Sequence, residues 1–174
     1  MILGFKPRNH PQQVAKYGGA CDDTDDRRTP HEVFDAWNSR YHFTLDAAAS
    51  DENALCAMYC TREHSGLDAS WDGHRVWCNP PYSNLVAWVA KADAAMRQGA
   101  CECVVMLLPA NRTEQRWWQD LIEPYRDDAP REGVRLTSRF LRGRMRFSRP
   151  GWTTPAKGDR PPFGIVILTW ERIP

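Results

Sequence analysis

The chain has 174 residues, of which 42% are hydrophobic and 26% are charged, and its formal net charge is +1. That length is right for one domain with a sizeable core, and a second domain would need more residues. No apolar run approaches the roughly 20 residues needed to cross a membrane, and the N-terminal stretch lacks the apolar centre of a signal peptide, so we expect a cytosolic protein.

Residues 1–28 are polar and contain two prolines and a Gly-Gly pair, so we expect a loosely held arm there. A short amphipathic helix is predicted over "TPHEVFDAWNSRY". Thr29 precedes Pro30 at the start of this helix and Glu32 follows three residues after Thr29, which is the pattern of a capped N-terminus. Residues 29–174 are therefore expected to form one folded domain.

Two short stretches follow this helix. A brief strand is predicted over "FTLDAAAS", which ends in the carboxylate of Asp46 and in small residues. The pattern of "ALCAMYC" fits a strand or a helix. Cys56, Cys60 and His64 have a loose metal-like spacing, but without a Cys-x-x-Cys pair we expect no metal site. The six cysteines of such a chain are expected to be free thiols.

The rest of the chain alternates apolar strands with helices. A strand is predicted over "RVWCN", a helix ending at Gly99 over "NLVAWVAKADAAMRQG", and a nearly continuous apolar strand over "CECVVMLLPA". The next helix is predicted over "RTEQRWWQDLIEPY" and the last strand over "PFGIVILTW". Strands that are apolar on both faces and separated by helices indicate an α/β three-layer fold, with a mostly parallel sheet and helices on both of its faces.

In such a sheet, ligands bind outside the carboxyl ends of the strands. Three stretches with polar groups fall at strand ends: Asp46, residues 79–82 and residues 109–112. We therefore expect the functional site to be built from these three stretches.

The tetrapeptide Asn79-Pro80-Pro81-Tyr82 is the most informative of the three. Two successive prolines lack backbone donors and stiffen the chain, so the Asn79 side chain and the Pro80 carbonyl can face a cleft as acceptors. Two fixed acceptors beside the flat ring of Tyr82 suit a planar group with an exocyclic amine, such as a flipped adenine. Accepting both amine hydrogens localises the lone pair and makes the nitrogen a nucleophile. The alternative is an ordinary proline-rich turn.

At these residues the chain resembles the phage-type DNA N-6-adenine methyltransferase family, whose members use S-adenosylmethionine. The similarity rests on "RTPHEVFDAW", "FTLDAAAS", "GLDASWDGHRVWCNPPYS" and "VVMLLPANRT", which occur in this order within residues 26–170. The resemblance implies a Rossmann-like methyltransferase fold and methylation of adenine N6 in double-stranded DNA.

The resemblance also implies roles for single residues. Thr29 and Pro30 would border the methionine part of the cofactor, Asp46 would bind its amino group, and Asp68 would bind its adenine. A carboxylate at Asp46 suits a cofactor that carries an ammonium and a sulfonium. Asp46 and Thr29 also fit helix caps, and for Thr29 the two roles can coexist. The glycine-rich loop of many methyltransferases is absent, and "DAAAS" stands in its place.

The segment 131–160 holds nine Lys/Arg against two acidic residues. Arginines that contact phosphates would position a duplex, and a subset of them would read guanine edges. The candidate DNA contacts here and after the "LLPAN" strand end are Arg112, Arg116, Arg139, Arg142, Arg144 and Arg146. The alternation of the last three also fits a strand with one exposed basic face.

The same residues also fit other substrates. A related methyltransferase would act on RNA, on cytosine N4 or on a protein glutamine, because each presents an amine or amide to the same acceptors. The alternative from another class is a non-catalytic DNA-binding remnant of the fold, which would bind DNA in a salt-sensitive way and bind no cofactor. No obligatory protein partner is evident in the sequence.

Overall fold

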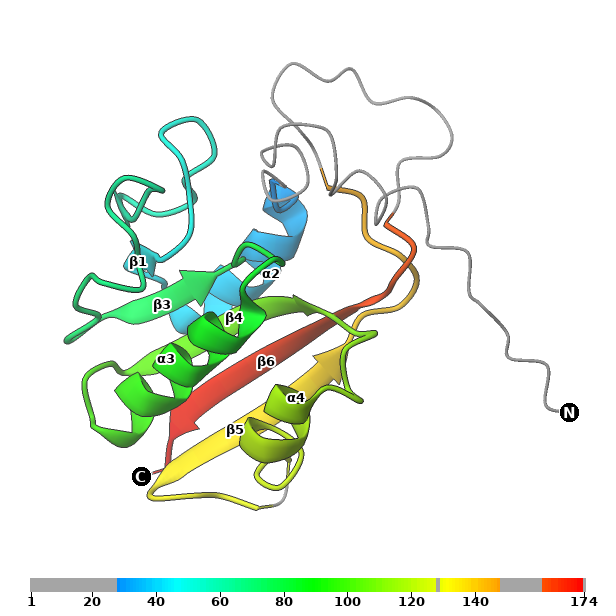
Figure 1. The fold of residues 1–174 in the computed structure, drawn as a ribbon. Helices are drawn as coiled ribbons and strands as arrows, with labels where there is room; N and C mark the ends of the chain where they lie inside the picture. The colour runs from blue at the N-terminus through cyan, green and yellow to red at the C-terminus, as the bar shows by residue number, and fades with distance from the viewer. Residues whose placement is uncertain (1–27, 128, 148–160, 174) are drawn as a thin grey trace, which may run out of the picture.

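The computed structural model describes residues 28–127, 129–147 and 161–173 (Figure 1). The strands are β1 Leu45–Asp46, β2 Met58–Tyr59, β3 Arg75–Cys78, β4 Cys103–Pro109, β5 Val134–Phe140 and β6 Ile165–Arg172. The helices are α2 His31–Tyr41, α3 Leu85–Arg97 and α4 Arg116–Leu121. The predicted arm up to residue 27 and the end of the basic segment, residues 148–160, lie outside the described residues.

The six strands form one sheet in the order β2-β1-β3-β4-β6-β5. The strands β2, β1, β3 and β4 run parallel to one another, whereas β6 is antiparallel to both β4 and β5. Figure 1 shows the arrowheads of β3 and β5 pointing one way and that of β6 pointing the other way. The sheet is therefore mixed, with its parallel part at the β2 side.

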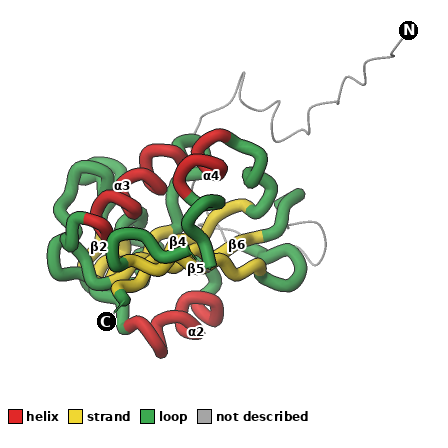
Figure 2. The backbone as a smooth tube through the Cα atoms, turned by 90° about the horizontal axis from the view of Figure 1, so that it is seen from below, coloured by secondary structure: helices red, strands yellow, loops and turns green. Residues whose placement is uncertain are grey.

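Helices cover both faces of this sheet. Helix α2 lies on one face, and α3 and α4 lie on the other (Figure 2). The predicted α/β arrangement with three layers is confirmed. None of the described helices is long and apolar enough to span a membrane.

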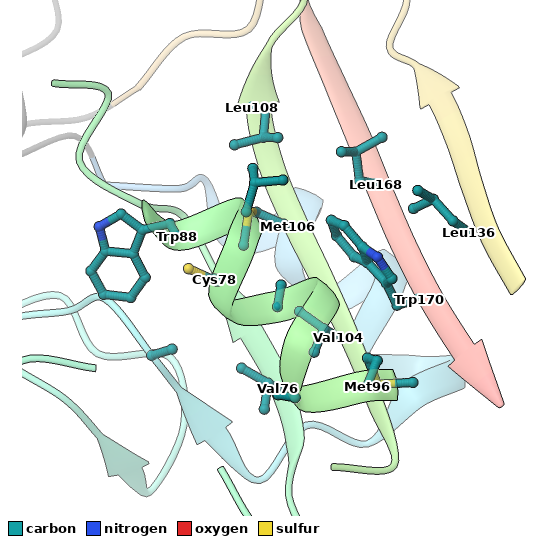
Figure 3. Packing of buried hydrophobic residues seen from close by; sticks show 14 of the residues in the cluster. Val76, Cys78, Trp88, Met96, Val104, Met106, Leu108, Leu136, Leu168 and Trp170 are labelled. Carbon is teal, nitrogen blue, oxygen red and sulfur yellow. The ribbon is translucent and has the colours of Figure 1, made fainter. Parts of the chain in front are cut away.

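The side chains of β4 alternate between two cores. Val105 and Leu107 pack with Phe34 of α2. Val104 and Met106 belong to the core on the other face, together with side chains of α3 and β6 (Figure 3). Successive side chains of a strand point to opposite faces, so a strand between two helical layers is apolar at every position. All seven residues of β4 are buried for this reason.

The start of α2 differs from the prediction. The helix begins at His31, with Pro30 at the N-cap position and no side-chain cap. Because Pro30 has an extended ψ of 137°, the helical turn begins only after it. The predicted capping role of Thr29 is therefore wrong, and Thr29 is buried instead.

The basic segment also differs from the prediction. An edge strand, β5, ends at Phe140, before Arg142, Arg144 and Arg146, so the alternative of a strand through these arginines is wrong. Gly143 has a φ of +77°, a left-handed conformation that interrupts an extended chain. The three arginines therefore lie on a loop that leaves the carboxyl end of β5.

Candidate active site

Parallel strands place their carboxyl ends at one edge of the sheet, and this edge collects the predicted site residues. Asp46 ends β1, residues 79–82 follow β3, and residues 110–112 follow β4. Because β5 runs parallel to β4, the loop 141–147 leaves β5 at the same edge. We refer to this edge as the carboxyl edge.

The Asn79-Pro80-Pro81-Tyr82 stretch forms the connection between β3 and α3. Pro80 is buried, and Asn79 and Tyr82 are half-buried. The Pro81 carbonyl accepts a hydrogen bond of 3.2 Å from the Asn84 backbone N–H, which turns the chain into α3. The tetrapeptide is thus held between a buried strand and a helix on the sheet.

Two phenylalanines from distant parts of the chain pack against Tyr82. Its ring centroid lies 6.3 Å from that of Phe147 and 5.8 Å from that of Phe163, with interplanar angles of 83° and 60°. Such tilted contacts are favourable, and together they restrict the orientation of the tyrosine ring. Phe147 is the last residue of the loop 141–147, which we call the basic loop, and Phe163 precedes β6. The site role of Phe163 was not predicted, because next to an apolar strand it has only the sequence signal of a core residue.

Asp46 is a buried carboxylate, with 3% of its surface exposed. It accepts backbone N–H groups from Leu55 at 3.1 Å and from Ala48 at 3.4 Å. Burial raises the pKa of Asp46 from 3.8 to about 6, and the two backbone donors lower it only partly. No helix follows β1, so the alternative of a helix cap is wrong, and the carboxylate instead holds the loop 47–55.

The loop of residues 65–71, which carries Asp68, packs directly on the backbone that follows Asp46. A Cβ atom at Gly66 would lie 2.0 Å from the Ala47 carbonyl oxygen, so only glycine permits this approach. The Trp71 indole N–H donates to the Gly66 carbonyl at 3.0 Å. Asp68 itself is exposed. The fold thus brings the chain segment of Asp68 close to that of Asp46.

Thr29 and Pro30 lie beside the same region. The preceding residue, Arg28, forms an ion pair of 2.9 Å with Glu52, which belongs to the loop 47–55 held by Asp46. The Nε of Arg28 is buried and has no hydrogen-bond partner. The segment before α2 and the loop after β1 are therefore in contact.

Comparison with known proteins identifies the family. A family model described as DNA N-6-adenine-methyltransferase (Dam) matches residues 20–158. The chain belongs to this family. The resemblance expected from the motifs is thereby confirmed.

Two curated relatives, each named DNA N-6-adenine-methyltransferase, match parts of this family member. That of Escherichia phage T1 is 39% identical over 87 residues, which are 49% of this chain and 36% of the relative. That of Haemophilus phage HP1 is 40% identical over 50 residues, which are 29% of each protein. The chain thus spans about a third of the length of these curated relatives.

In this member of the DNA N-6-adenine-methyltransferase family, four of the candidate DNA-binding arginines lie at the carboxyl edge. Arg142 and Arg144 are exposed, whereas Arg112 and Arg146 are half-buried. The Nε atoms of Arg112 and Arg146 are buried and have no hydrogen-bond partner. Phe147 connects the end of this basic loop to Tyr82.

The two other candidate arginines have partners within the protein. Arg116 is in α4, where its 94% exposed side chain pairs with Asp120 at 3.1 Å. The guanidinium carbon of Arg139, on β5, lies 5.8 Å from the centroid of the Trp37 ring. An exposed ion pair and a contact with an aromatic ring leave the positive charge in place but contribute little stability.

The cysteines of the described part of this family member are free thiols, namely Cys56, Cys60, Cys78, Cys101 and Cys103. Within the same part, no three His, Cys, Asp or Glu residues gather into a group that could hold a metal ion.

Proposed function

We propose that this protein transfers the methyl group of S-adenosylmethionine to N6 of adenine in double-stranded DNA, in the cytoplasm, which is that of the host cell if a phage or prophage encodes the protein. Its family and the names of both phage relatives support this activity. The observation that carries the proposal is the meeting of the Asn79–Tyr82 stretch and the buried carboxylate of Asp46 at one edge of the sheet.

The target adenine is proposed to leave the DNA stack and to lie on Tyr82, whose ring Phe147 and Phe163 hold in place. The Asn79 side-chain oxygen and the Pro80 carbonyl accept the two hydrogens of the 6-amino group. The bound cofactor supplies an electrophilic methyl group. The 6-amino nitrogen would accept the methyl group, which leaves S-adenosylhomocysteine, and would lose one proton to solvent. Positioning and electrostatics are therefore the main contributions of the protein.

Asp46 fits the ammonium group of the cofactor. Burial raises the pKa of this carboxylate, and none of the salt bridges of the described residues includes it, so a bound cation would offset its lost hydration. Thr29 and Pro30 would border the methionine part, and Asp68 would bind the adenine. We also propose that residues 29–174 form a single domain with a Rossmann-like methyltransferase fold.

Duplex DNA is proposed to bind along the carboxyl edge. Arg112, Arg142, Arg144 and Arg146 would contact phosphates there, and Arg116 and Arg139 would extend this surface over α4 and β5. The basic loop ends at Phe147, whose ring packs on Tyr82. The proposed phosphate contacts would therefore lie next to the tyrosine ring that is proposed to receive the base.

The test is transfer of labelled methyl from S-adenosylmethionine to unmethylated duplex DNA, followed by digestion to nucleosides. We expect label in N6-methyladenine and a rate reduced at least ~100-fold in Asn79→Ala, which removes one acceptor. Asn84→Ala is the matched control, because Asn84 is exposed and its side chain makes no cap hydrogen bond.

Full activity of Asn79→Ala would overturn the proposed mechanism. Label in N4-methylcytosine, RNA or a protein glutamine would reassign the substrate. Salt-sensitive DNA binding with neither transfer nor cofactor binding would identify a non-catalytic remnant.

A further inference from the structure

Lys91 contacts the loop 65–71, which carries Asp68. It lies on α3, and its ammonium group donates to the backbone carbonyls of Leu67 at 2.7 Å and Ala69 at 2.6 Å. The same Nζ lies 5.2 Å from the centroid of the Trp71 ring. The Lys91 side chain therefore links three residues of the loop 65–71 to α3.

These contacts surround Asp68 in the sequence. The two carbonyls that Lys91 holds belong to the residues on either side of Asp68. The backbone N–H groups of Asp68 and Ala69 donate to the Ser65 carbonyl at 2.9 and 3.0 Å, which closes the turn. The backbone on both sides of Asp68 is thus fixed, while its carboxylate is exposed.

The loop is also fixed on its other side. Gly66 packs on the Ala47 carbonyl, next to Asp46, and a Cβ at Gly66 would lie 3.1 Å from the indole of Trp88 on α3. The loop is therefore clamped between α3 and the end of β1. Lys91 and Gly66 therefore both hold the backbone around Asp68 near the segment that carries Asp46.

If this position served packing alone, a lysine would be unfavourable, because partial burial of its ammonium group costs solvation free energy. Trp88, Ala92 and Ala95 on the same helix are buried, and a methionine would cover Trp71 without desolvating a charge. Burial lowers the pKa of Lys91, and the nearby carboxylate of Asp68 raises it. What the ammonium adds is the pair of hydrogen bonds that orient the loop.

We propose that Lys91 is a positioning residue for the cofactor, which acts by holding Asp68 in place for the adenosine part of S-adenosylmethionine. This inference rests on the proposed function. In this proposal Lys91 acts on the cofactor only through Asp68, so its effect is confined to cofactor affinity.

The test is calorimetric titration of S-adenosylmethionine into the full chain and into Lys91→Met, Asp68→Asn and the double variant. We expect each single change to raise Kd about tenfold, and the double variant to bind no more weakly than the weaker single variant, because the two residues act as one unit. Affinity for a fixed duplex DNA is expected to stay unchanged.

Arg97→Met is the matched control, because it removes a cation and its ion pairs with Asp93 and Glu132 from the same helix without touching the loop. It is expected to bind the cofactor like the parent protein.

If Lys91→Met fails to fold, Lys91→Gln replaces it, since a glutamine amide can still donate to one carbonyl.

The outcomes separate the two proposals. Absence of cofactor binding in the parent protein overturns the proposed function and this inference together. Binding by the parent protein with equal affinity in Lys91→Met overturns this inference alone. Effects of Lys91→Met and Asp68→Asn that multiply also overturn it, because a purely structural lysine would act independently of Asp68.

Discussion

At the scale of single residues, the charge of Asp46 opposes the stability of the fold. Its folded pKa of about 6 lies above its ordinary value of 3.8, so the folded protein favours the protonated form. The stability that this preference contributes is present below about pH 4 and is lost as the pH rises through 6. At neutral pH the ionised Asp46 therefore destabilises the protein without its ligand.

Asp46→Asn is expected to raise the unfolding temperature of the ligand-free protein at pH 7.5 and to weaken cofactor binding at least ~10-fold. The gain in stability stays below ~3 kcal/mol, which corresponds to a pKa shift of about two units, because asparagine accepts fewer hydrogen bonds from the loop. Thermal unfolding with and without S-adenosylmethionine measures both effects. The gain should shrink as the pH falls from 7 to 4, and a variant that is less stable at pH 7.5 would contradict this account.

At the scale of elements, the contact between the loop 65–71 and β1 depends on one glycine. Gly66→Ala would place a Cβ 2.0 Å from the Ala47 carbonyl oxygen, so the loop must move away from β1. We expect a loss of about 1–3 kcal/mol in unfolding free energy, measured in urea, and a weaker affinity for the cofactor. Gly73→Ala is the control for loop substitution, since a Cβ there meets no atom within 4 Å, although its φ of +70° adds backbone strain. Unchanged cofactor affinity in Gly66→Ala would contradict a role for this contact.

The central elements could be predicted from the sequence because burial on both faces leaves a strong pattern. Strand β4 and helix α3 were predicted correctly, since an apolar run and an apolar helical face each reflect the layers around them. Strand β5 was missed because it is an edge strand, with exposed Arg135 and Arg139 beside buried Val134 and Leu136. The neighbouring arginines made this weak alternation look like a binding segment.

The positions of the candidate site residues in the fold could be predicted only where a motif stands next to a strand end. Asp46 and the Asn79–Tyr82 stretch satisfied that condition. Other contacts join segments that are far apart in the sequence, so no local sequence pattern predicts these contacts. Phe163 packs on Tyr82, and Lys91 hydrogen-bonds to the loop 65–71. Thr29 was placed correctly before the helix, but the extended Pro30 excluded it from the cap.

At the scale of the whole molecule, an almost neutral chain places several arginines on one edge. The net charge is only +1, so we expect the proposed attraction for DNA to come from the carboxyl edge rather than from the protein as a whole. Opposite this edge lie the amino end of β3 and the carboxyl end of β6, where Arg75 and Arg40 are paired with Glu102 and Glu171. DNA binding is therefore expected to be one-sided.

Replacing Arg142 and Arg144 together by alanine is expected to reduce the slope of log K against log salt by about 1.8, because each lost phosphate contact removes about 0.9. Methylation at saturating DNA should keep its rate. Filter binding of a duplex over a range of salt concentrations measures the slope. The matched control replaces Arg40 and Arg75, at the opposite edge, and an equal change in that control would contradict one-sided binding.

The position of β6 also has a consequence for how the chain folds. This strand comes last in the sequence, yet it lies between β4 and β5 and pairs with both of them. During synthesis on the ribosome, the fully apolar β4 has an unpaired edge until residues 165–172 emerge from the exit tunnel. Pairings over such long sequence separations make folding slow. We therefore expect the nascent chain to be most open to aggregation through β4 until β6 is complete.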